Sequence, residues 1–397
     1  KTKEDIWDIG TKGKGKKEGN FGGFSEFMDV VIQFGHTVDL SVSGHDMKSL
    51  TVEEGGKVYA NNNSSPEYID IYGNVVNNGT IGNGGTLDYI SFNFMGTGTI
   101  EFSGTGSFNV GRMRKNNGAT GSVTLNADIN LNYPGACLYN NEANSIYNVT
   151  IPAGRTVSIT DATGDVSIDG TDGTVGTNRG GSIVVNGTLL IGDRLYARSN
   201  NTALPCSITI GSAGKIVTEN VSMNIDGSGF SAFNINAGAI LEVNGVMNMT
   251  GGTLNSNGGL VLNSGATLLH GAGTTGGGGN VSGDVVVKRQ GSAGNAYNYW
   301  STPVSNTPPL MGSSAYRYDS NLGTMDSSDD AEDPGWVSYY SGPMAIGEGY
   351  ASKGAGLVSF VGPVNNGNLS KPVVNYPFTP GNTDPGTPFN YVGNPYP

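Results

Sequence analysis

The stretch Ser207-Ile-Thr-Ile-Gly-Ser-Ala-Gly-Lys-Ile-Val217 decides the fold of this chain. It consists of a short run in which apolar and polar residues alternate, a corner that contains glycine, and a second short run. Alternation with a period of two is typical of β-strands that bury one face. Related phrases occur throughout the sequence, at 49–59, 182–191, 233–243 and 260–269.

This repetition indicates a solenoid, in which each unit buries its apolar side only by stacking on its neighbours. The glycines at the corners recur at intervals of about 25 residues in most places. Coils of this length with three short strands each predict an all-β fold, a right-handed parallel β-helix. The alternation assigns these residues to its interior: Val149, Ile151, Val157, Ile159, Ile183, Val185, Leu189, Ile191, Ile208, Ile210, Ile216, Phe233, Ile235, Val243, Leu260, Leu262 and Leu268.

Two corners have the sequence Asn-Gly, at Asn78-Gly79 and at Asn186-Gly187. Glycine and asparagine tolerate a positive φ better than other residues. We therefore expect these residues to supply the positive φ that a sharp bend requires.

Changes in composition predict four segments. Residues 1–27 are polar and rich in glycine and lysine, and we expect an irregular cap there. The period-two pattern then extends over 28–272, which is the predicted β-helix. A Gly-rich joint follows at 273–284. Residues 285–397 contain most of the prolines and many aromatic residues, which predicts a small antiparallel β domain that is incomplete at its C-terminal end.

The net charge of −12 argues against nucleic acid as a partner, because phosphates require a basic surface. No apolar run is long enough to span a bilayer, so no transmembrane segment is predicted. The two cysteines, Cys137 and Cys206, are predicted to lie nearly three coils apart, which is too far for a disulfide unless a long excursion brings them together. We expect two buried thiols.

Several motifs carry a resemblance to a known family. The segment from Trp7 through Val38, followed by 49–56, resembles the opening of secreted β-solenoid proteins of Bacteroidota. The C-terminal landmarks are similar to a segment that often follows such solenoids; they are Tyr299-Trp-Ser-Thr-Pro-Val-Ser, Tyr316-Arg-Tyr-Asp, Gly335-Trp-Val, Gly347-Glu-Gly-Tyr and Val392-Gly-Asn-Pro-Tyr-Pro.

The resemblance implies an adhesin-like product of the cell surface, exported by the type IX secretion machinery through a C-terminal sorting domain. No sorting domain is visible in the 397 residues, and we expect the native chain to extend further. The resemblance implies no catalytic residue.

A polysaccharide lyase or glycoside hydrolase is the enzymatic alternative, since such enzymes need carboxylates that meet in one cleft. The candidates are Asp161, Asp165, Asp169 and Asp172, with Arg155, Arg179 and Arg194 near them in sequence. Aspartate beside glycine is also typical of turns, where it accepts local hydrogen bonds from the backbone. We favour turn chemistry and predict that the chain is not an enzyme.

Three further groups of residues are candidate sites. Clustered carboxylates favour Ca²⁺, and the weak candidates are Asp326, Asp329, Asp330 and Asp333. Their spacing matches no known Ca²⁺ loop, so we predict a solvated acidic loop and no cofactor. The three histidines, His36, His45 and His270, are dispersed, and no metal site is predicted from them. Candidates for stacking on a sugar are Trp300, Trp336, Tyr339 and Tyr340, with a role in the core as the alternative.

The sequence thus predicts an extracellular structural or adhesive rod that presents a polar surface to glycans or other cells. The alternatives are the polysaccharide-degrading enzyme and a passive scaffold or cargo of the secretion system. The ligand and the oligomeric state are not determined by the sequence.

Overall fold

The computed structural model describes residues 28–40, 44–60, 67–82, 89–116, 120–168, 179–197, 204–225, 230–270, 278–305, 314–319, 335–339, 342–354, 356–373 and 390–397. The regular elements in these segments are all β-strands, with no helix. A helix long and apolar enough to cross a membrane is accordingly not found in the described part of the chain. The predicted residues 1–27 of the N-terminal cap lie outside it.

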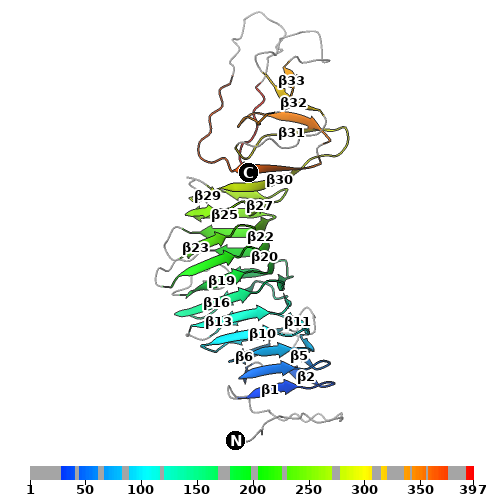
Figure 1. Ribbon diagram of the computed structural model, residues 1–397, viewed down its shortest axis with the longest axis vertical. Coiled ribbons are helices and arrows are strands. Elements are labelled where there is room, and N and C mark those ends of the chain that lie inside the picture. Colours follow the sequence, from blue (N-terminus) through cyan, green and yellow to red (C-terminus); the bar gives the residue numbers. More distant parts are fainter. Residues whose placement is uncertain are drawn as a thin grey trace, which may run out of the picture.

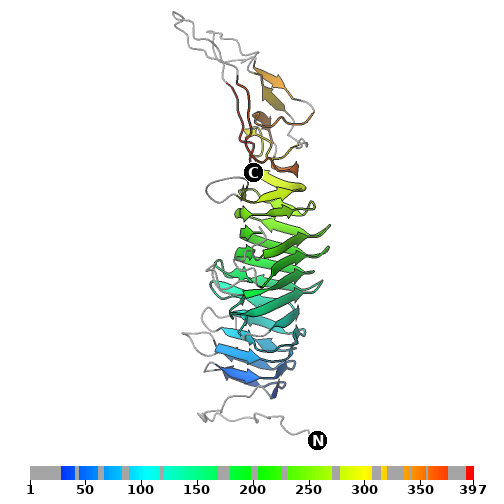
Figure 2. The same cartoon turned by 90° about the vertical axis from the view of Figure 1, so that its left-hand side faces the viewer.

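Successive coils stack into a tall parallel β-helix with three columns of strands (Figures 1 and 2). The first column contains β1 (Asp29–Ile32), β4 (Ser49–Val52), β7 (Val75–Asn77), β10 (Thr99–Ser103), β13 (Gly121–Asn126), β16 (Ser145–Ile151), β19 (Arg179–Val185), β21 (Cys206–Ile210) and β23 (Phe230–Ile235). These nine stacked strands enclose eight turns. Two later strands, β26 (Thr253–Asn255) and β29 (Asn280–Ser282), pair in parallel with each other.

The second column contains β2 (Thr37–Leu40), β5 (Lys57–Ala60), β8 (Thr80–Ile81), β11 (Ser107–Val110), β14 (Ile129–Leu131), β17 (Thr156–Ile159), β24 (Ile240–Val243), β27 (Leu260–Leu262) and β30 (Asp284–Gln290). The third contains β3 (His45–Met47), β6 (Glu67–Ile71), β9 (Ile90–Phe94), β12 (Met113–Lys115), β15 (Ala136–Asn140), β18 (Asp165–Ser167), β25 (Val246–Gly251) and β28 (Thr267–Leu269). Two long strands, β20 (Thr188–Ala197) and β22 (Lys215–Asn224), take part in both columns.

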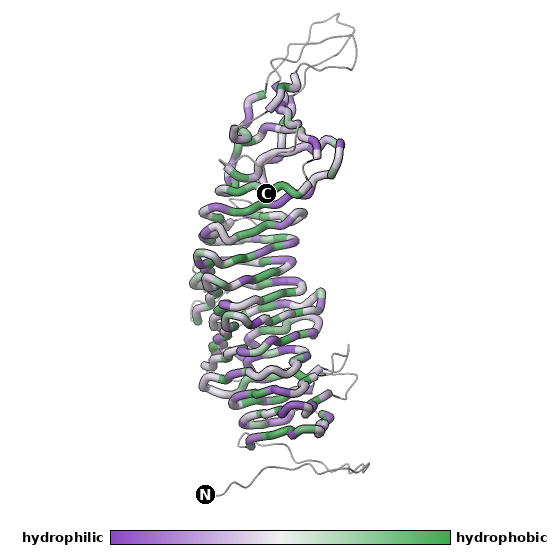
Figure 3. Tube along the Cα trace, turned by 45° about the vertical axis from the view of Figure 1, so that its right-hand side comes forward, coloured by the Kyte–Doolittle hydropathy of each residue, from purple (hydrophilic) through white to green (hydrophobic). Residues whose placement is uncertain are grey.

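In-register stacking of apolar side chains forms the core. Ile183, Ile208 and Phe233 occupy equivalent positions in three successive coils, and their side chains are buried. All of the residues that the sequence assigned to the interior are buried. The hydropathy along the chain alternates within each coil and repeats from coil to coil (Figure 3). The prediction of a parallel β-helix is confirmed.

The glycines at two corners serve a different purpose from the one predicted. Gly79 and Gly187 are not among the glycines with a positive φ. A Cβ at Gly79 would overlap the carbonyl oxygen of Gly56 in the coil before it, and one at Gly187 would overlap that of Arg155. The prediction was wrong at these two corners, because close contact between coils, and not backbone conformation, excludes a side chain.

A buried lysine interrupts the apolar core. Lys115, on β12, has no exposed surface, and its Nζ donates hydrogen bonds to the carbonyl oxygens of Phe94 (3.3 Å) and Gly96 (3.0 Å). Burial lowers the pKa of the Lys115 ammonium group to about 8, against an opposing attraction from Glu142.

The two cysteines are free and fully buried, as expected. Burial raises the pKa of the Cys137 thiol to about 12. Thiols with this property are chemically inert and act as small apolar groups.

The terminal domain contains the antiparallel sheet β31 (Tyr297–Trp300), β34 (Tyr350–Lys353), β32 (Ala315–Tyr318) and β33 (Trp336–Ser338), in that order. It is joined to the solenoid through β35 (Leu357–Pro363), which pairs with β30 in antiparallel register over seven residues. Antiparallel pairing along β30 covers the final edge of the second column and thereby protects it from pairing with other chains. A small antiparallel β domain after the solenoid is therefore confirmed.

The predicted joint lies close to this connection. Residues 271–277 are outside the described part of the chain, whereas β29 and β30 still pair in parallel with β26 and β27. Parallel stacking thus continues to Val287.

Replacement of Ile208 by alanine should lower the free energy of unfolding by about 2–5 kcal/mol, because it removes buried apolar atoms and leaves a cavity. The control is Thr209→Ala on the outward side of β21, which should change stability by less than about 0.5 kcal/mol. Urea unfolding of the two variants checks this expectation. Equal losses for both would contradict the placement of Ile208 inside the coil.

The low pKa of Lys115 predicts a pH effect on stability. Between pH 8 and the ordinary lysine value of 10.5, the unfolded chain binds more protons at this residue than the folded chain does. The contribution of Lys115 to stability therefore increases as the pH rises through this window, by about 2–3 kcal/mol in total.

Comparison with Lys115→Met separates this contribution from those of Tyr147, Tyr350 and Cys137. Burial raises the pKa of each of these three groups, so their contributions to stability fall as the pH rises. The unfolding free energy of the native chain minus that of this variant should increase from pH 8 to 10.5. The exposed Lys57 serves as control. The unfolding free energy of the native chain minus that of Lys57→Met should not change over this pH range. A flat difference for Lys115→Met would contradict a desolvated ammonium.

Candidate functional site

One face of the rod has an open and regular outer surface, which we call the polar face. It consists of two outward-facing ladders on the first column, in which equivalent residues of successive coils lie side by side. One ladder comprises Thr99, Ser122, Asn148, Ser182, Ser207 and Ala232, and the other comprises Glu101, Thr124, Thr150, Val184, Thr209 and Asn234. Each residue is half-buried or exposed.

Charge is almost absent from the polar face. Glu101 is the sole charged member of its two ladders, and its Oε1 accepts a hydrogen bond from Nδ2 of Asn126 at 2.8 Å. Neighbouring rungs are linked by side chains, as where Oγ of Ser182 donates to Oδ1 of Asn148 at 2.9 Å. Such a surface offers many hydroxyl and amide groups in a fixed, flat array, which suits shallow polar contacts.

The third column is covered on its outside by an Arg–Tyr cluster, which comprises Tyr68, Asn93, Arg112, Arg114, Tyr133 and Tyr139. The guanidinium of Arg112 lies 3.4 Å from the centre of the Tyr133 ring, and its Nη1 donates to the hydroxyl of Tyr139 at 3.0 Å. Nε of Arg114 donates to Oδ1 of Asn93 at 2.6 Å.

The contacts of this cluster are made within the protein. They leave every residue of β9 and β15 buried, so that these two strands are covered on both faces. The third column is therefore closed along these coils, whereas the outward residues of the first column are half-buried or exposed.

A row of aromatic rings lies on the terminal domain. Tyr299 contacts Tyr391 edge to face, with 5.7 Å between ring centres, Tyr391 contacts Trp336 at 5.3 Å, and Trp336 contacts Tyr318 at 5.3 Å. These rings come from β31, β33, β32 and the C-terminal segment, so the row connects the strands of the sheet to that segment.

Glycines in the C-terminal motifs make room for these rings. A Cβ at Gly349 would overlap Cδ1 and Cε1 of Tyr391, and one at Gly335 would lie 2.5 Å from Cε2 of Tyr318. In the motifs Gly347-Glu-Gly-Tyr and Gly335-Trp-Val, each of these glycines therefore leaves space for one aromatic ring from another part of the domain.

The predicted stacking residues have different environments. Trp300 is 8% exposed, packs on Phe360 and donates from Nε1 to Oγ of Ser352 at 2.8 Å, so it belongs to the core. Trp336 is half-buried within the aromatic row. Tyr339 packs against Tyr350 and donates to the carbonyl oxygen of Gly342. Tyr340 lies outside the described residues.

The candidate carboxylates serve the fold. Oδ1 of Asp161 accepts hydrogen bonds from the backbone N–H (2.8 Å) and the hydroxyl (2.6 Å) of Thr163, which is turn chemistry. Asp165 is buried on β18 and accepts from the backbone N–H of Arg194 at 3.2 Å. The remaining candidates, Asp169 and Asp172, fall outside the described residues.

The arginines near these carboxylates also bind the protein itself. Nε of Arg155 donates to Asn126, Nη2 of Arg179 to the carbonyl oxygen of Asn141, and Nη1 of Arg194 to the hydroxyl of Tyr196. Each arginine thus links its strand or turn to a neighbouring residue of the solenoid.

The weak Ca²⁺ candidates Asp326, Asp329, Asp330 and Asp333 lie in 320–334, outside the described residues. His36 follows β1, His45 lies on β3 and His270 follows β28, so the structure does not bring the histidines together. Within the described segments, no group of three or more histidine, cysteine, aspartate or glutamate side chains is arranged to hold a metal ion.

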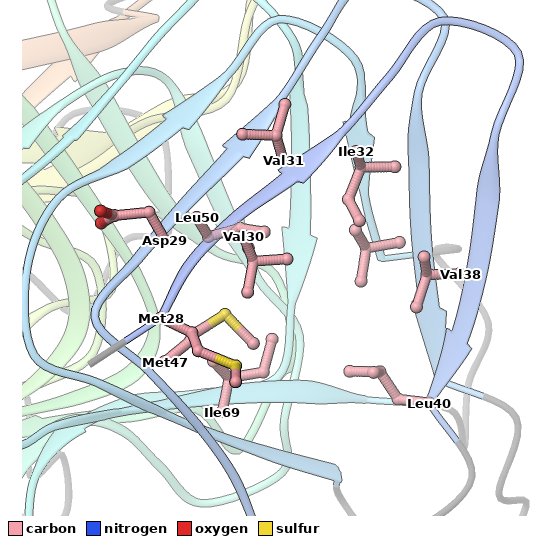
Figure 4. A pocket seen from close by; sticks show the side chains of 11 residues that line it. Met28, Asp29, Val30, Val31, Ile32, Val38, Leu40, Met47, Leu50 and Ile69 are labelled. Atoms are coloured by element: carbon pink, nitrogen blue, oxygen red, sulfur yellow. The ribbon is translucent and has the colours of Figure 1, made fainter. Parts of the chain in front are cut away.

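A small hollow lies at the N-terminal end of the core, among Met28, Val30, Leu40 and Met47 (Figure 4). Its volume is about 40 Å³, far below the roughly 300–1,000 Å³ of ligand sites. Its walls are mainly aliphatic side chains of the first coils, and it is therefore a packing gap at the end of the stack.

A family model described as a domain of unknown function (DUF8693) matches residues 203–397. The matched segment begins before β21 and so includes the last coils of the solenoid as well as the terminal domain. No curated protein and no solved structure matches the chain.

The sequence predicted a polar outer surface but did not place it on the first column, and it did not predict the Arg–Tyr cluster. The polar face had a signal, because serine, threonine and asparagine recur at the outward positions of the first strand in successive coils. Arg112 and Arg114 also have a spacing of two, typical of neighbours on one face of a strand. Their tyrosine partners lie in other coils. Because the coils differ in length, no fixed spacing in the sequence points to these partners.

Replacement of Gly349 by alanine should displace the Tyr391 ring and disrupt the aromatic row. We expect a weaker near-ultraviolet circular dichroism signal and faster proteolysis between β33 and the C-terminal segment, with the solenoid intact. Gly98→Ala is the control, since a Cβ there meets no atom within 4 Å. A native near-ultraviolet spectrum for Gly349→Ala would contradict the predicted displacement of the ring.

Proposed function

We propose that this chain is an extracellular, adhesive β-helix protein of the cell surface, and that it presents its polar face to glycans or other cells. The observation that carries this proposal is the pair of nearly uncharged, in-register ladders on the first column. Hydroxyl and amide groups at the spacing of stacked strands, about 4.8 Å, repeat the same contact along the rod. Many weak contacts of this kind give useful avidity when they act together.

The charge and the shape support the same proposal. A net charge of −12 favours solubility and disfavours binding to nucleic acid and to anionic lipid. A solenoid with a continuous core holds its surface groups at fixed distances, so that little conformational entropy is lost when a ligand binds. Export by the type IX machinery is part of the proposal and depends on the resemblance of the terminal motifs.

We further propose that the chain is not an enzyme. Asp161 and Asp165 accept hydrogen bonds that hold a turn and a strand, and Asp165 is buried. A polysaccharide-degrading site would require two carboxylates free to face a substrate.

A glycan array and a cell-binding assay with the double variant Thr150→Arg, Thr209→Arg test the proposal. Two unpaired charges in the polar face should weaken binding at least about tenfold, since a flat neutral partner cannot compensate them. The matched control is Ser158→Arg on β17, an outward position of the second column, which should leave binding unchanged.

Other outcomes would support the alternatives. An array with no hits for the native chain would favour a passive scaffold, and depolymerisation of pectin-like or alginate-like polymers would establish an enzyme. Equal loss of binding for Ser158→Arg would contradict the choice of the first column.

A further inference from the structure

A second surface, separate from the polar face, has the features of a ligand site. A cavity of about 450 Å³ lies between the last coils and the terminal domain, within the range of small-molecule sites. We call it the junction pocket. Its walls include Arg289, Gln290, Tyr299, Ser301, Asn394 and Tyr396. The C-terminal end lies at this junction in both views of the ribbon (Figures 1 and 2).

Hydrogen bonds hold the walls of the junction pocket in place. β30, which carries Arg289, pairs with β35 over seven residues. Nδ2 of Asn365 donates to the carbonyl oxygens of Thr302 (2.9 Å) and Pro395 (2.7 Å) and so links two walls. These contacts fix the walls relative to each other, so binding would require little reordering of the pocket.

The pocket contains a cation that forms no ion pair among the described residues. Nη1 of Arg289 donates to the carbonyl oxygens of Lys288 (2.9 Å) and Asn263 (3.5 Å). No ion pair among the described residues involves Arg289, whereas Lys215, Arg317 and Lys371 each have a carboxylate partner. Burial lowers the pKa of the Arg289 guanidinium, which reflects the cost of a charge held away from water.

Two exposed tyrosines form an aromatic wall. Tyr299 is 64% exposed and is held from one side by the ring of Tyr391. Tyr396 is 40% exposed, and its hydroxyl donates to the carbonyl oxygen of Gly367 at 2.8 Å. Rings that are fixed by the protein and open to solvent provide the apolar surface on which the C–H face of a sugar can lie.

Polar groups complete the wall. Oγ of Ser301 is buried and makes no hydrogen bond to a described residue. Oδ1 of Asn394 accepts from the backbone N–H of Tyr396 at 3.1 Å, which leaves the amide nitrogen of Asn394 as a donor. A hydroxyl group of a ligand would accept a hydrogen bond from this amide nitrogen.

We propose that the junction pocket binds a carboxylated sugar, a residue of the uronic-acid class within an acidic glycan, with its carboxylate on Arg289 and its ring against Tyr299. A guanidinium recognises a carboxylate through two parallel hydrogen bonds, which a neutral sugar cannot form. This inference deepens the proposed adhesive function and rests on it, but it uses a different surface from the polar face.

Calorimetric titration of the full chain with trigalacturonate and with its methyl ester tests the proposal. The ester keeps the shape of the sugar and removes the charge, so it should bind at least about tenfold more weakly, as expected for loss of a charge-assisted hydrogen bond. This comparison uses the native chain and does not depend on the folding of any variant.

Variants then locate the site. Arg289→Gln and Tyr299→Ala should each weaken binding of trigalacturonate about tenfold or more. The matched controls are Lys288→Gln, which removes a charge next to Arg289, and Tyr297→Ala, which removes an exposed ring of the same strand; neither residue lines the pocket. Both controls should bind like the native chain.

Four results would overturn the proposal: no binding of trigalacturonate, equal affinity for acid and ester, native affinity of both pocket variants, or loss of affinity in the controls. The double variant Thr150→Arg, Thr209→Arg should retain trigalacturonate binding. If it does while adhesion to cells is absent from the native chain, the polar-face proposal fails and the pocket stands. If adhesion is present and trigalacturonate does not bind, the pocket proposal fails and the polar-face proposal stands.

Discussion

In-register stacking of aliphatic side chains between successive coils is the interaction on which the rest of the structure depends. A single coil has no interior of its own, because its three short strands bury apolar groups only against the coils on either side. Ile208 shows this directly, since it lies between Ile183 and Phe233 in the same ladder. Register is strongly specified in such a stack, because a shift by one residue would turn the apolar side chains outward.

Stacking in register also creates the outer surface. When inward residues are aligned, the outward residues between them must be aligned too, so Thr124, Thr150 and Thr209 share one ladder. The same constraint explains the Arg–Tyr cluster, in which side chains of neighbouring coils meet across a fixed distance. Function in this protein is therefore expected in repeated or junctional surfaces, where several coils or two domains meet.

The sequence predicted the solenoid and its interior well, because alternation with a period of two is a local signal and is repeated many times. It predicted the individual contacts less well. Lys115 occupies an inward position that the pattern would assign to an apolar residue, and its carbonyl partners come from the preceding coil. The junction pocket could not be predicted, since it forms where β30, β31 and the C-terminal segment meet, and no local pattern places those segments together.

Spin labels on the polar face test the stacking most directly. Thr124→Cys and Asn234→Cys would place two labels in one ladder, four strand steps apart, while the native thiols are buried and would remain unlabelled. At about 4.8 Å per step the account predicts a narrow distance distribution centred near about 20 Å, measured by double electron–electron resonance. A broad distribution, or one centred beyond about 35 Å, would contradict a continuous stack, since no arrangement with four strand steps reaches that far.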